Sequence, residues 1–201
     1  MRVSYQKHNI SCDIPPNFRT HQYPAMASER SPTVKIRPAI FPADKKAVSN
    51  LFLAYEQLLL NTHNVSLDFQ GFDHEVASLP GKYAIENDGG LWLAYIDSST
   101  SDGQSTTEKV IGCIGLRAFT KSLSGELKRL YLAPESRGLG VSKLLMNVAI
   151  ARARELGYKE ILLDTLSGMT SARRVYSKYG FMEVPAYYES HPDAVYYQLE
   201  V

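Results

Sequence analysis

The segment Arg-Gly-Leu-Gly-Val-Ser at residues 137–142 has the residue types and spacing to bind an anion where a helix begins. The first turn of a helix leaves backbone N–H groups without partners and carries a partial positive charge. Glycines at 138 and 140 let the backbone approach an anion closely, and a diphosphate fits such a site. Arg137 adds a positive charge and Ser142 adds a hydroxyl. The simpler alternative is that the two glycines only make a tight turn.

Two other phosphate-binding motifs do not fit this segment. The spacing differs from the Gly-x-Gly-x-x-Gly fingerprint of dinucleotide-binding domains, and no acidic residue ends a strand about 20 residues later. The chain also has no Gly-Lys-Ser/Thr phosphate loop. The sequence therefore predicts an anion site of a different kind.

Two elements must hold the glycine turn in place. A strand is expected over 125–132 before it, and a helix follows it. The helix has one apolar stripe at helical spacing and ends at Gly157. The stripe consists of Val141, Leu144, Leu145, Val148 and Leu156.

The rest of the chain predicts one mixed sheet with helices on its faces. Apolar and alternating runs indicate strands over 33–40, 89–97, 108–119, 125–132, 159–165 and 194–201. Helices are expected to open at Pro42–Asp44, to occupy 73–79 and 171–181, and to follow the glycine turn. A polar, flexible hairpin connection is expected between the second and third strands. The strands form an antiparallel meander first and a β-α-β-α-β unit afterwards.

Composition places the chain among globular proteins of ordinary charge. Its 201 residues are 44% hydrophobic and 21% charged, with a formal net charge of +1, so neither a nucleic-acid nor a membrane partner is indicated. No apolar run reaches the roughly 18 residues of a membrane span. Two cysteines, Cys12 and Cys113, indicate no disulfide framework, which favours the cytoplasm, with the nucleus as the alternative. Residues 1–31 are polar and proline-rich, and we expect a loosely ordered extension before a domain over 32–201.

Three motifs, in order and at matching spacing, resemble the GNAT superfamily of acetyltransferases. Residues 137–142 resemble its motif Arg/Gln-x-x-Gly-x-Gly/Ala, with Ser142 at the last position. The segment 125–138 resembles its fourth strand and the bulge after it. Residues 171–181 resemble its Ala-x-x-x-Tyr-x-x-x-Gly-Phe motif, where Met169 replaces a frequent asparagine. The resemblance covers about residues 34–201.

The resemblance implies a fold and an acetyl donor. The expected fold is an α/β (α+β) GNAT fold: a mixed, mostly antiparallel central sheet of six to seven strands with helices on both faces, splayed between strands 4 and 5. The donor would be acetyl-CoA, whose pantetheine arm lies in the splay and whose thioester carbonyl takes the Leu130 N–H. Strand alternation would turn Tyr131 to the other face. The implied cofactor-binding residues are Leu130, Tyr131, Leu132, Arg137, Gly138, Leu139, Gly140, Val141, Ser142 and Tyr176.

The resemblance also implies two catalytic residues, Glu126 and Tyr176. An alkylammonium with a pKa of about 10.4 must lose a proton before it attacks, and a carboxylate takes it directly or through water. Glu126 matches the position of the general base in several family members; a surface residue paired with Lys128 or Arg129 is the alternative. Tyr176 matches the tyrosine near the thioester sulfur and is the candidate general acid; a packed core tyrosine is the alternative.

The acceptor pocket is expected between the early helices and the last hairpin. Aromatic rings with a nearby carboxylate suit an amine that carries an apolar body. The candidate substrate-binding residues are Phe69, Phe72, Glu75 and Tyr187, with Gln70, His74, Tyr188, Glu189 and His191 beside them. The simpler interpretation makes both clusters core and loop residues, with His191 solvated. No residue spacing indicates a metal site, and Cys113 is expected to be a buried packing residue.

These features predict an N-acetyltransferase that transfers acetyl from acetyl-CoA directly to a primary amine. A small molecule or an amino-acid-like compound is the expected acceptor. A protein acetyltransferase acting on lysines or chain termini is the first alternative, and a non-catalytic acyl-CoA-binding module is the second. Whether the chain forms a homodimer is left open.

Overall fold

The computed structural model describes residues 32–99, 106–119 and 123–201. The expected extension over 1–31 and the connection over 100–105 lie outside these ranges. In chain order the elements are β1 (Val34–Pro38), α1 (Lys45–His63), α2 (Phe72–Ala77), β2 (Gly90–Ser99), β3 (Thr106–Ala118), β4 (Ser124–Leu132), α3 (Val141–Glu155), β5 (Glu160–Leu166), α4 (Thr170–Lys178), β6 (Met182–Val184) and β7 (Ala194–Glu200).

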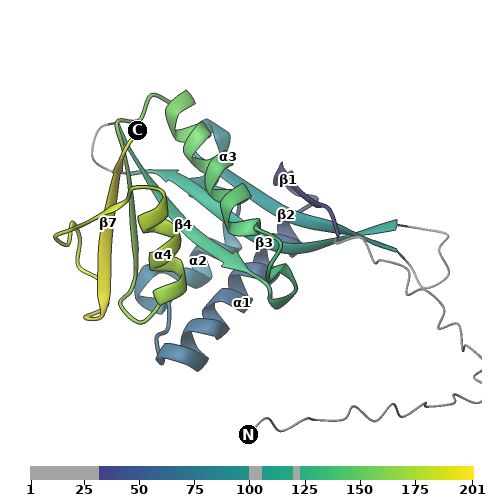
Figure 1. Ribbon diagram of the computed structural model, residues 1–201, viewed down its shortest axis with the longest axis horizontal. Helices are drawn as coiled ribbons and strands as arrows, with labels where there is room; N and C mark the ends of the chain where they lie inside the picture. The colour runs from purple at the N-terminus through teal and green to yellow at the C-terminus, as the bar shows by residue number, and fades with distance from the viewer. Residues whose placement is uncertain (1–31, 100–105, 120–122) are drawn as a thin grey trace, which may run out of the picture. The chain divides into compact units, whose positions relative to one another are not determined.

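The strands form one sheet in the order β1-β2-β3-β4-β5-β7-β6 (Figure 1). Only β4 and β5 pair in parallel; the other neighbours are antiparallel. The expected meander is β1 to β4, and the β-α-β-α-β unit follows with α3 and α4. The mixed, mostly antiparallel sheet predicted from the sequence is confirmed, with seven strands among the described residues.

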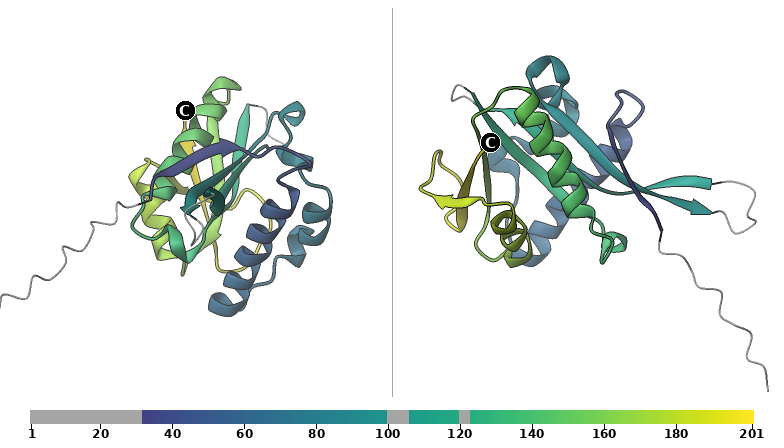
Figure 2. Two further views of the ribbon diagram at one scale, coloured as in Figure 1. Left: turned by 90° about the vertical axis from the view of Figure 1, so that its right-hand side faces the viewer. Right: turned by 45° about the horizontal axis from the view of Figure 1, so that its top comes forward.

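Helices cover both faces of the sheet. The views of Figure 2 show α1 and α2 on one side and α3 and α4 on the other. Leu145, Met146 and Ala149 of α3 are fully buried against β2, β3 and β4. Val48, Phe52 and Leu59 of α1 are buried with Leu93 and Cys113 on the opposite face. The sheet therefore separates two apolar cores, one under each pair of helices.

The sheet opens between β4 and β5, as predicted. These strands pair only from Ser124 opposite Glu160 to Glu126 opposite Leu162. Beyond this point β4 runs on to Leu132 and β5 to Leu166 without further pairing to each other. The gap between them, called the β4–β5 gap below, leaves backbone on both strands without a ladder partner.

A bulge at Arg129 turns β4 away from β5. Cys113 pairs with Tyr131 and Gly115 pairs with Lys128, so β4 has one extra residue against β3. Arg129 has a φ of 56°, a left-handed conformation that is uncommon outside glycine. Because this conformation interrupts the alternation of the strand, Lys128 and Arg129 both reach groups on the side of α1 and α2.

The bulge is held by a buried ion pair. Nε and Nη2 of Arg129 donate to the two carboxylate oxygens of Glu75, each at 2.8 Å. Glu75 also accepts from Tyr83 Oη at 2.8 Å and from Lys82 Nζ at 2.7 Å. Cys113 Sγ donates to the Arg129 carbonyl at 3.3 Å. We call the Arg129–Glu75 pair the bulge clamp, because it fixes the bulge to α2.

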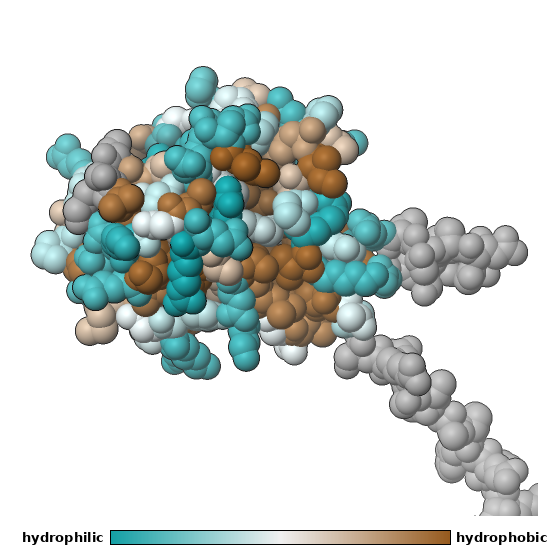
Figure 3. All heavy atoms as spheres, turned by 90° about the horizontal axis from the view of Figure 1, so that it is seen from above, coloured by the Kyte–Doolittle hydropathy of each residue, from teal (hydrophilic) through white to brown (hydrophobic). Residues whose placement is uncertain are grey.

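Apolar side chains also reach the surface. Ile40, Ile85 and Met182 are 62%, 69% and 71% exposed. Figure 3 shows apolar and polar residues interspersed on the face seen from above, as on ordinary protein surfaces. Within the described ranges, no helix combines the length and the apolar character needed to cross a bilayer.

The bulge clamp predicts a large loss of stability when Glu75 is changed to Gln. Removing one partner leaves Arg129 buried without a counter-charge, which costs about 3–5 kcal/mol in the free energy of unfolding. Urea unfolding at neutral pH measures this. The matched control is Lys82→Met, because Lys82 is partly exposed and its loss costs about 1 kcal/mol or less. Equal stability of wild type and Glu75→Gln would contradict the clamp.

The same pair predicts how stability depends on pH. Burial alone would raise the pKa of Glu75, but Arg129 and Lys82 outweigh it and lower the pKa to about 2. Because the pKa is lower in the folded chain than in the unfolded chain, the stabilisation is complete above about pH 5 and is lost as the pH falls through about 2. The stability difference between wild type and Glu75→Gln should shrink over that window.

Candidate functional site

The glycine turn lines an open hollow at the start of α3. We call it the phosphate hollow, after the ligand that the sequence predicts there; its volume is about 340 Å³. Seven of the predicted cofactor-binding residues line it, namely Tyr131, Leu132, Arg137, Gly138, Gly140, Val141 and Ser142. The predicted residue Leu139 is not among them, because its side chain packs against the core under α3.

The backbone of the turn has the conformation that glycine permits. Gly138 and Gly140 have φ values of 76° and 68°, and apart from the adjoining residues no protein atom lies within 4 Å of where a β-carbon would stand. The space next to both residues is therefore open to a ligand. In the described part of the chain, no backbone carbonyl accepts from the N–H groups of Val141 and Ser142. Arg137 is exposed and forms no ion pair with another described residue.

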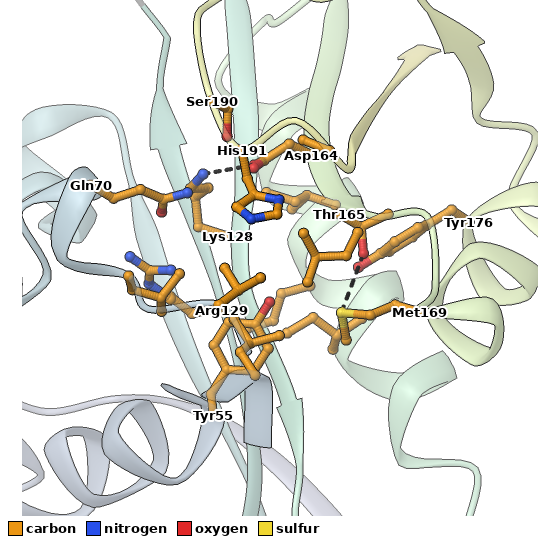
Figure 4. Close-up of a pocket in the computed structure, with 18 of the residues that line it drawn as sticks. Tyr55, Gln70, Lys128, Arg129, Asp164, Thr165, Met169, Tyr176, Ser190 and His191 are labelled. Carbon is orange, nitrogen blue, oxygen red and sulfur yellow. Dashed lines mark hydrogen bonds and ion pairs between the residues drawn. The ribbon is translucent and has the colours of Figure 1, made fainter. Parts of the chain in front are cut away.

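A second, narrower space lies at the β4–β5 gap. This central cavity has a volume of about 50 Å³ and takes its lining from both faces of the sheet (Figure 4). Leu127, Met146 and Tyr176 belong to the core under α3 and α4, whereas Tyr55 and Leu59 come from α1. Leu130 also lines it, next to Tyr131 and Leu132 of the phosphate hollow. Consecutive residues of β4, 130–132, therefore line one space or the other, so the two spaces lie next to each other along this strand.

Alternation along β4 sends these three residues to different faces. Leu130 and Leu132 pack against the core under α3, and Tyr131 lies on the α1 side with its ring 6.2 Å from that of Tyr55. This matches the expected orientation of Tyr131.

Tyr176 reaches the central cavity from α4. Its ring is buried against Phe181 and Tyr197, and Figure 4 shows the side chain entering the cavity beside Thr165 and Met169. Burial raises the pKa of Tyr176 well above its ordinary value, and nearby Tyr55 and Asp164 add to the shift. The hydroxyl therefore stays protonated near neutral pH and is able to donate. Met169 precedes α4 and accepts a hydrogen bond from Thr165 Oγ1 at 3.6 Å.

Glu126 is fully buried and does not line the central cavity. Nε and Nη2 of Arg117 lie 2.6 Å and 2.5 Å from its Oε2, and Tyr187 Oη donates to Oε1 at 3.3 Å. The ammonium of Lys128 is 3.9 Å from Oε1. The alternative that Glu126 is a surface residue is wrong, because its side chain is fully buried. Its carboxylate also does not border the central cavity, so it has no direct contact with a molecule bound there.

The central cavity contains an ion pair that the sequence analysis missed. Lys128 Nζ lies 2.7 Å from Asp164 Oδ1 and 3.3 Å from Tyr188 Oη. Burial would raise the pKa of Asp164, but Lys128, with its hydrogen bond and that of Tyr188, lowers the pKa below the ordinary value. Asp164 is thus ionised at neutral pH. In the sequence, Asp164 could have been noticed as the one carboxylate inside the nearly all-apolar run 161–166.

The predicted acceptor residues separate into different environments. Phe69 is 52% exposed and lines the central cavity with Gln70 and His191. Phe72 is fully buried, with the Arg129 guanidinium over its ring, and Glu75 belongs to the bulge clamp. These two are therefore core residues in this structure.

Tyr187 stands apart from the central cavity, over Glu126. Its ring packs against those of Phe119, Tyr188 and Tyr196. Burial and the charge of Glu126 raise the pKa of Tyr187. His191 is half-buried and lines the cavity. Cys113 is buried as predicted, and burial raises the pKa of its thiol to about 12.

Comparison with known proteins agrees with this geometry. The model of the acetyltransferase (GNAT) family matches residues 53–181. Two uncharacterized N-acetyltransferases are similar: one from Schizosaccharomyces pombe is 34% identical over 72% of this chain and 83% of its own length, and one from Dictyostelium discoideum is 30% identical over 77% and 92%. The PaiA N-acetyltransferase of Thermoplasma acidophilum, solved in complex with coenzyme A, has the same fold with a TM-score of 0.56 at 17% identity, covering 84% of this chain and 99% of PaiA. The chain thus belongs to the GNAT family and is an acetyltransferase.

Proposed function

We propose that this enzyme transfers the acetyl group of acetyl-CoA directly to the primary amine of a small molecule. One observation carries the proposal: the phosphate hollow and the central cavity lie next to each other along residues 130–132 of β4. A donor with an anionic end and a reactive end fits this arrangement. Both similar eukaryotic relatives are named N-acetyltransferases, and PaiA was solved with coenzyme A, which supports the donor.

The donor's diphosphate would lie on the N-terminus of α3. Free N–H groups of Val141 and Ser142, the helix dipole and Arg137 all favour negative charge there. The pantetheine arm would follow β4 into the β4–β5 gap, where β5 offers no pairing. The thioester carbonyl would then accept from the Leu130 N–H. This hydrogen bond strengthens as the oxygen gains charge, so it favours the transition state.

The narrow central cavity supports a small acceptor. About 50 Å³ leaves room for the reacting groups rather than for a folded segment of another protein. Phe69 and Tyr55 supply an aromatic wall for an apolar body, and Lys128 and Asp164 supply charge. After attack, Tyr176 would donate its proton to the departing thiolate. The proton of the acceptor amine would go to a carboxylate; the family resemblance implies Glu126, but this residue is fully buried and does not line the central cavity.

The proposal is tested by measuring thiol release from acetyl-CoA with a panel of alkylamines, polyamines, amino acids and basic peptides. Release with small amines and little with peptides is the expected result. Faster release with peptides would move the assignment to a protein acetyltransferase. Tight binding of coenzyme A with no turnover on any amine would leave a non-catalytic binding module.

A change of Gly140 to Ala should weaken coenzyme A binding about tenfold, because a β-carbon in the left-handed conformation is strained and enters the space where the diphosphate would lie. Calorimetric titration with coenzyme A measures this. Gly157→Ala is the matched control: Gly157 follows the other end of α3, has a φ of 74° and also has open space around it. Both variants should lose similar stability. Equal affinities in the two variants would rule out the phosphate hollow as the binding site.

A change of Tyr176 to Phe should lower kcat by about 100-fold, because the thiolate loses its proton donor. The ring packing is kept, so the affinity for acetyl-CoA should change little. Steady-state kinetics and calorimetry separate the two effects. Tyr197→Phe serves as control, since its hydroxyl is bound to Arg173 outside the cavity. If kcat is the same in wild type and Tyr176→Phe, Tyr176 is only a packing residue.

A further inference from the structure

We propose that Asp164 is the carboxylate that binds the ammonium group of the acceptor and takes up its proton. This inference rests on the proposed function and concerns the acceptor side of the same site. Among the carboxylates of the described residues, Asp164 is the one that lines the central cavity. It does so together with Tyr176, the proposed donor to the leaving group, and Leu130, the proposed contact of the thioester.

Three carboxylates form the ion pairs that join β4 to other described elements, and their positions differ. Glu75 is held by Arg129, Lys82 and Tyr83, so both of its oxygens are occupied away from the cavity. Glu126 is held by Arg117 and Tyr187 and is wholly enclosed. Asp164 keeps a partly exposed side chain, 12% exposed, at the cavity wall. Only this carboxylate can meet an acceptor without a rearrangement of the core.

His191 also lines the cavity, but its ring is poorly prepared to accept a proton. Its Nδ1 accepts a hydrogen bond from the Asp193 backbone N–H at 3.1 Å. In a neutral imidazole with Nδ1 as acceptor, Nε2 carries the hydrogen. Neither nitrogen then has a free lone pair, which leaves Asp164 as the proton acceptor.

The ion pair of Lys128 and Asp164 shows that this wall already holds an ammonium group. Lys128 Nζ lies 2.7 Å from Asp164 Oδ1, over the ring of Tyr188 at 5.7 Å. The Oε1 atom of Gln70, which is buried and lines the same cavity, has no hydrogen-bond partner. Figure 4 draws Gln70, Lys128 and Asp164 together at one wall. An acceptor ammonium has three N–H donors, enough for a carboxylate oxygen and for Gln70 Oε1.

The surroundings also favour loss of the proton. A second ammonium beside Lys128 and Arg129 meets like charge in a cavity with little water, and both effects lower the pKa of an amine. The amine passes one proton to Asp164 and its nitrogen attacks the thioester carbon. The new C–N bond forms, the C–S bond breaks, and the second N–H proton reaches the thiolate through Tyr176. Asp164 then releases its proton to water, so the products are the amide, coenzyme A thiol and one proton.

The test compares Asp164→Asn with wild type on two probe acceptors, 2-phenylethylamine and aniline. The alkylamine is protonated at neutral pH and the arylamine is not. We expect Asp164→Asn to lose about 100-fold in kcat/KM with 2-phenylethylamine but no more than about threefold with aniline. Asp97→Asn, whose partner Lys35 lies on the exposed part of β1, is the control carboxylate and should resemble wild type on both.

Each other outcome has a definite meaning. Equal loss on both acceptors, or no loss on either, overturns the inference, as does a larger amine-dependent loss in Glu126→Gln. Failure of wild type on every amine in the presence of bound coenzyme A overturns the proposed function itself. If unpaired Lys128 destabilises Asp164→Asn, the double variant Lys128→Met/Asp164→Asn removes the lone charge, and it must show the same dependence on the acceptor.

Discussion

The divergence of β4 from β5 is the constraint on which the rest of the site depends, and one residue in a left-handed conformation produces it. Arg129 shifts the register of β4 against β3, so the strand leaves its parallel partner after Glu126. An unpaired strand inside a sheet exposes backbone donors and acceptors that must be satisfied. In an acyl-CoA-dependent enzyme, an amide-bearing cofactor arm meets this need. The unpaired backbone groups in the β4–β5 gap thus lower the stability of the ligand-free protein, and on the proposed function they bind the cofactor arm.

The bulge also explains why charge gathers at the middle of an otherwise apolar sheet. In a regular strand, Lys128 and Arg129 would face opposite sides. Here both point toward the side of α1 and α2, where Arg129 reaches Glu75 on α2 and Lys128 reaches Asp164 on β5. The same backbone irregularity therefore turns Arg129 to the side that Lys128 faces, next to the ion pair of Lys128 and Asp164 at the central cavity.

The sequence predicted the donor side of this molecule far better than the acceptor side. The glycine turn and Tyr176 each belong to one short motif, so a local pattern is enough to place them, and the splay was implied by the family resemblance. The acceptor side depends on contacts between distant segments. Glu75 was expected to face a substrate because aromatic residues flank it, but Arg129, 54 residues away, binds it in the core. In the sequence, Asp164 belongs to a nearly all-apolar strand. Its ion pair could not be predicted, because the partner, Lys128, is 36 residues away. The register shift at Arg129, which decides both pairs, has no glycine to mark it.

Among the described residues, three ion pairs join β4 to other elements, and their surroundings indicate which of them support the fold and which can take part in the reaction. Glu126 pairs with Arg117 of β3, Arg129 with Glu75 of α2, and Lys128 with Asp164 of β5. The first two join β4 to β3 and α2, and their carboxylates are buried and do not line the central cavity. A sealed pair fixes geometry but cannot exchange partners with a ligand without the large cost of exposing one buried charge. The third pair crosses the gap itself and borders the cavity with both of its members. On the proposed function a proton leaves the acceptor inside that cavity, so the pair that spans the gap is the one whose charges can respond to the reaction, while the other two hold the strand that positions it.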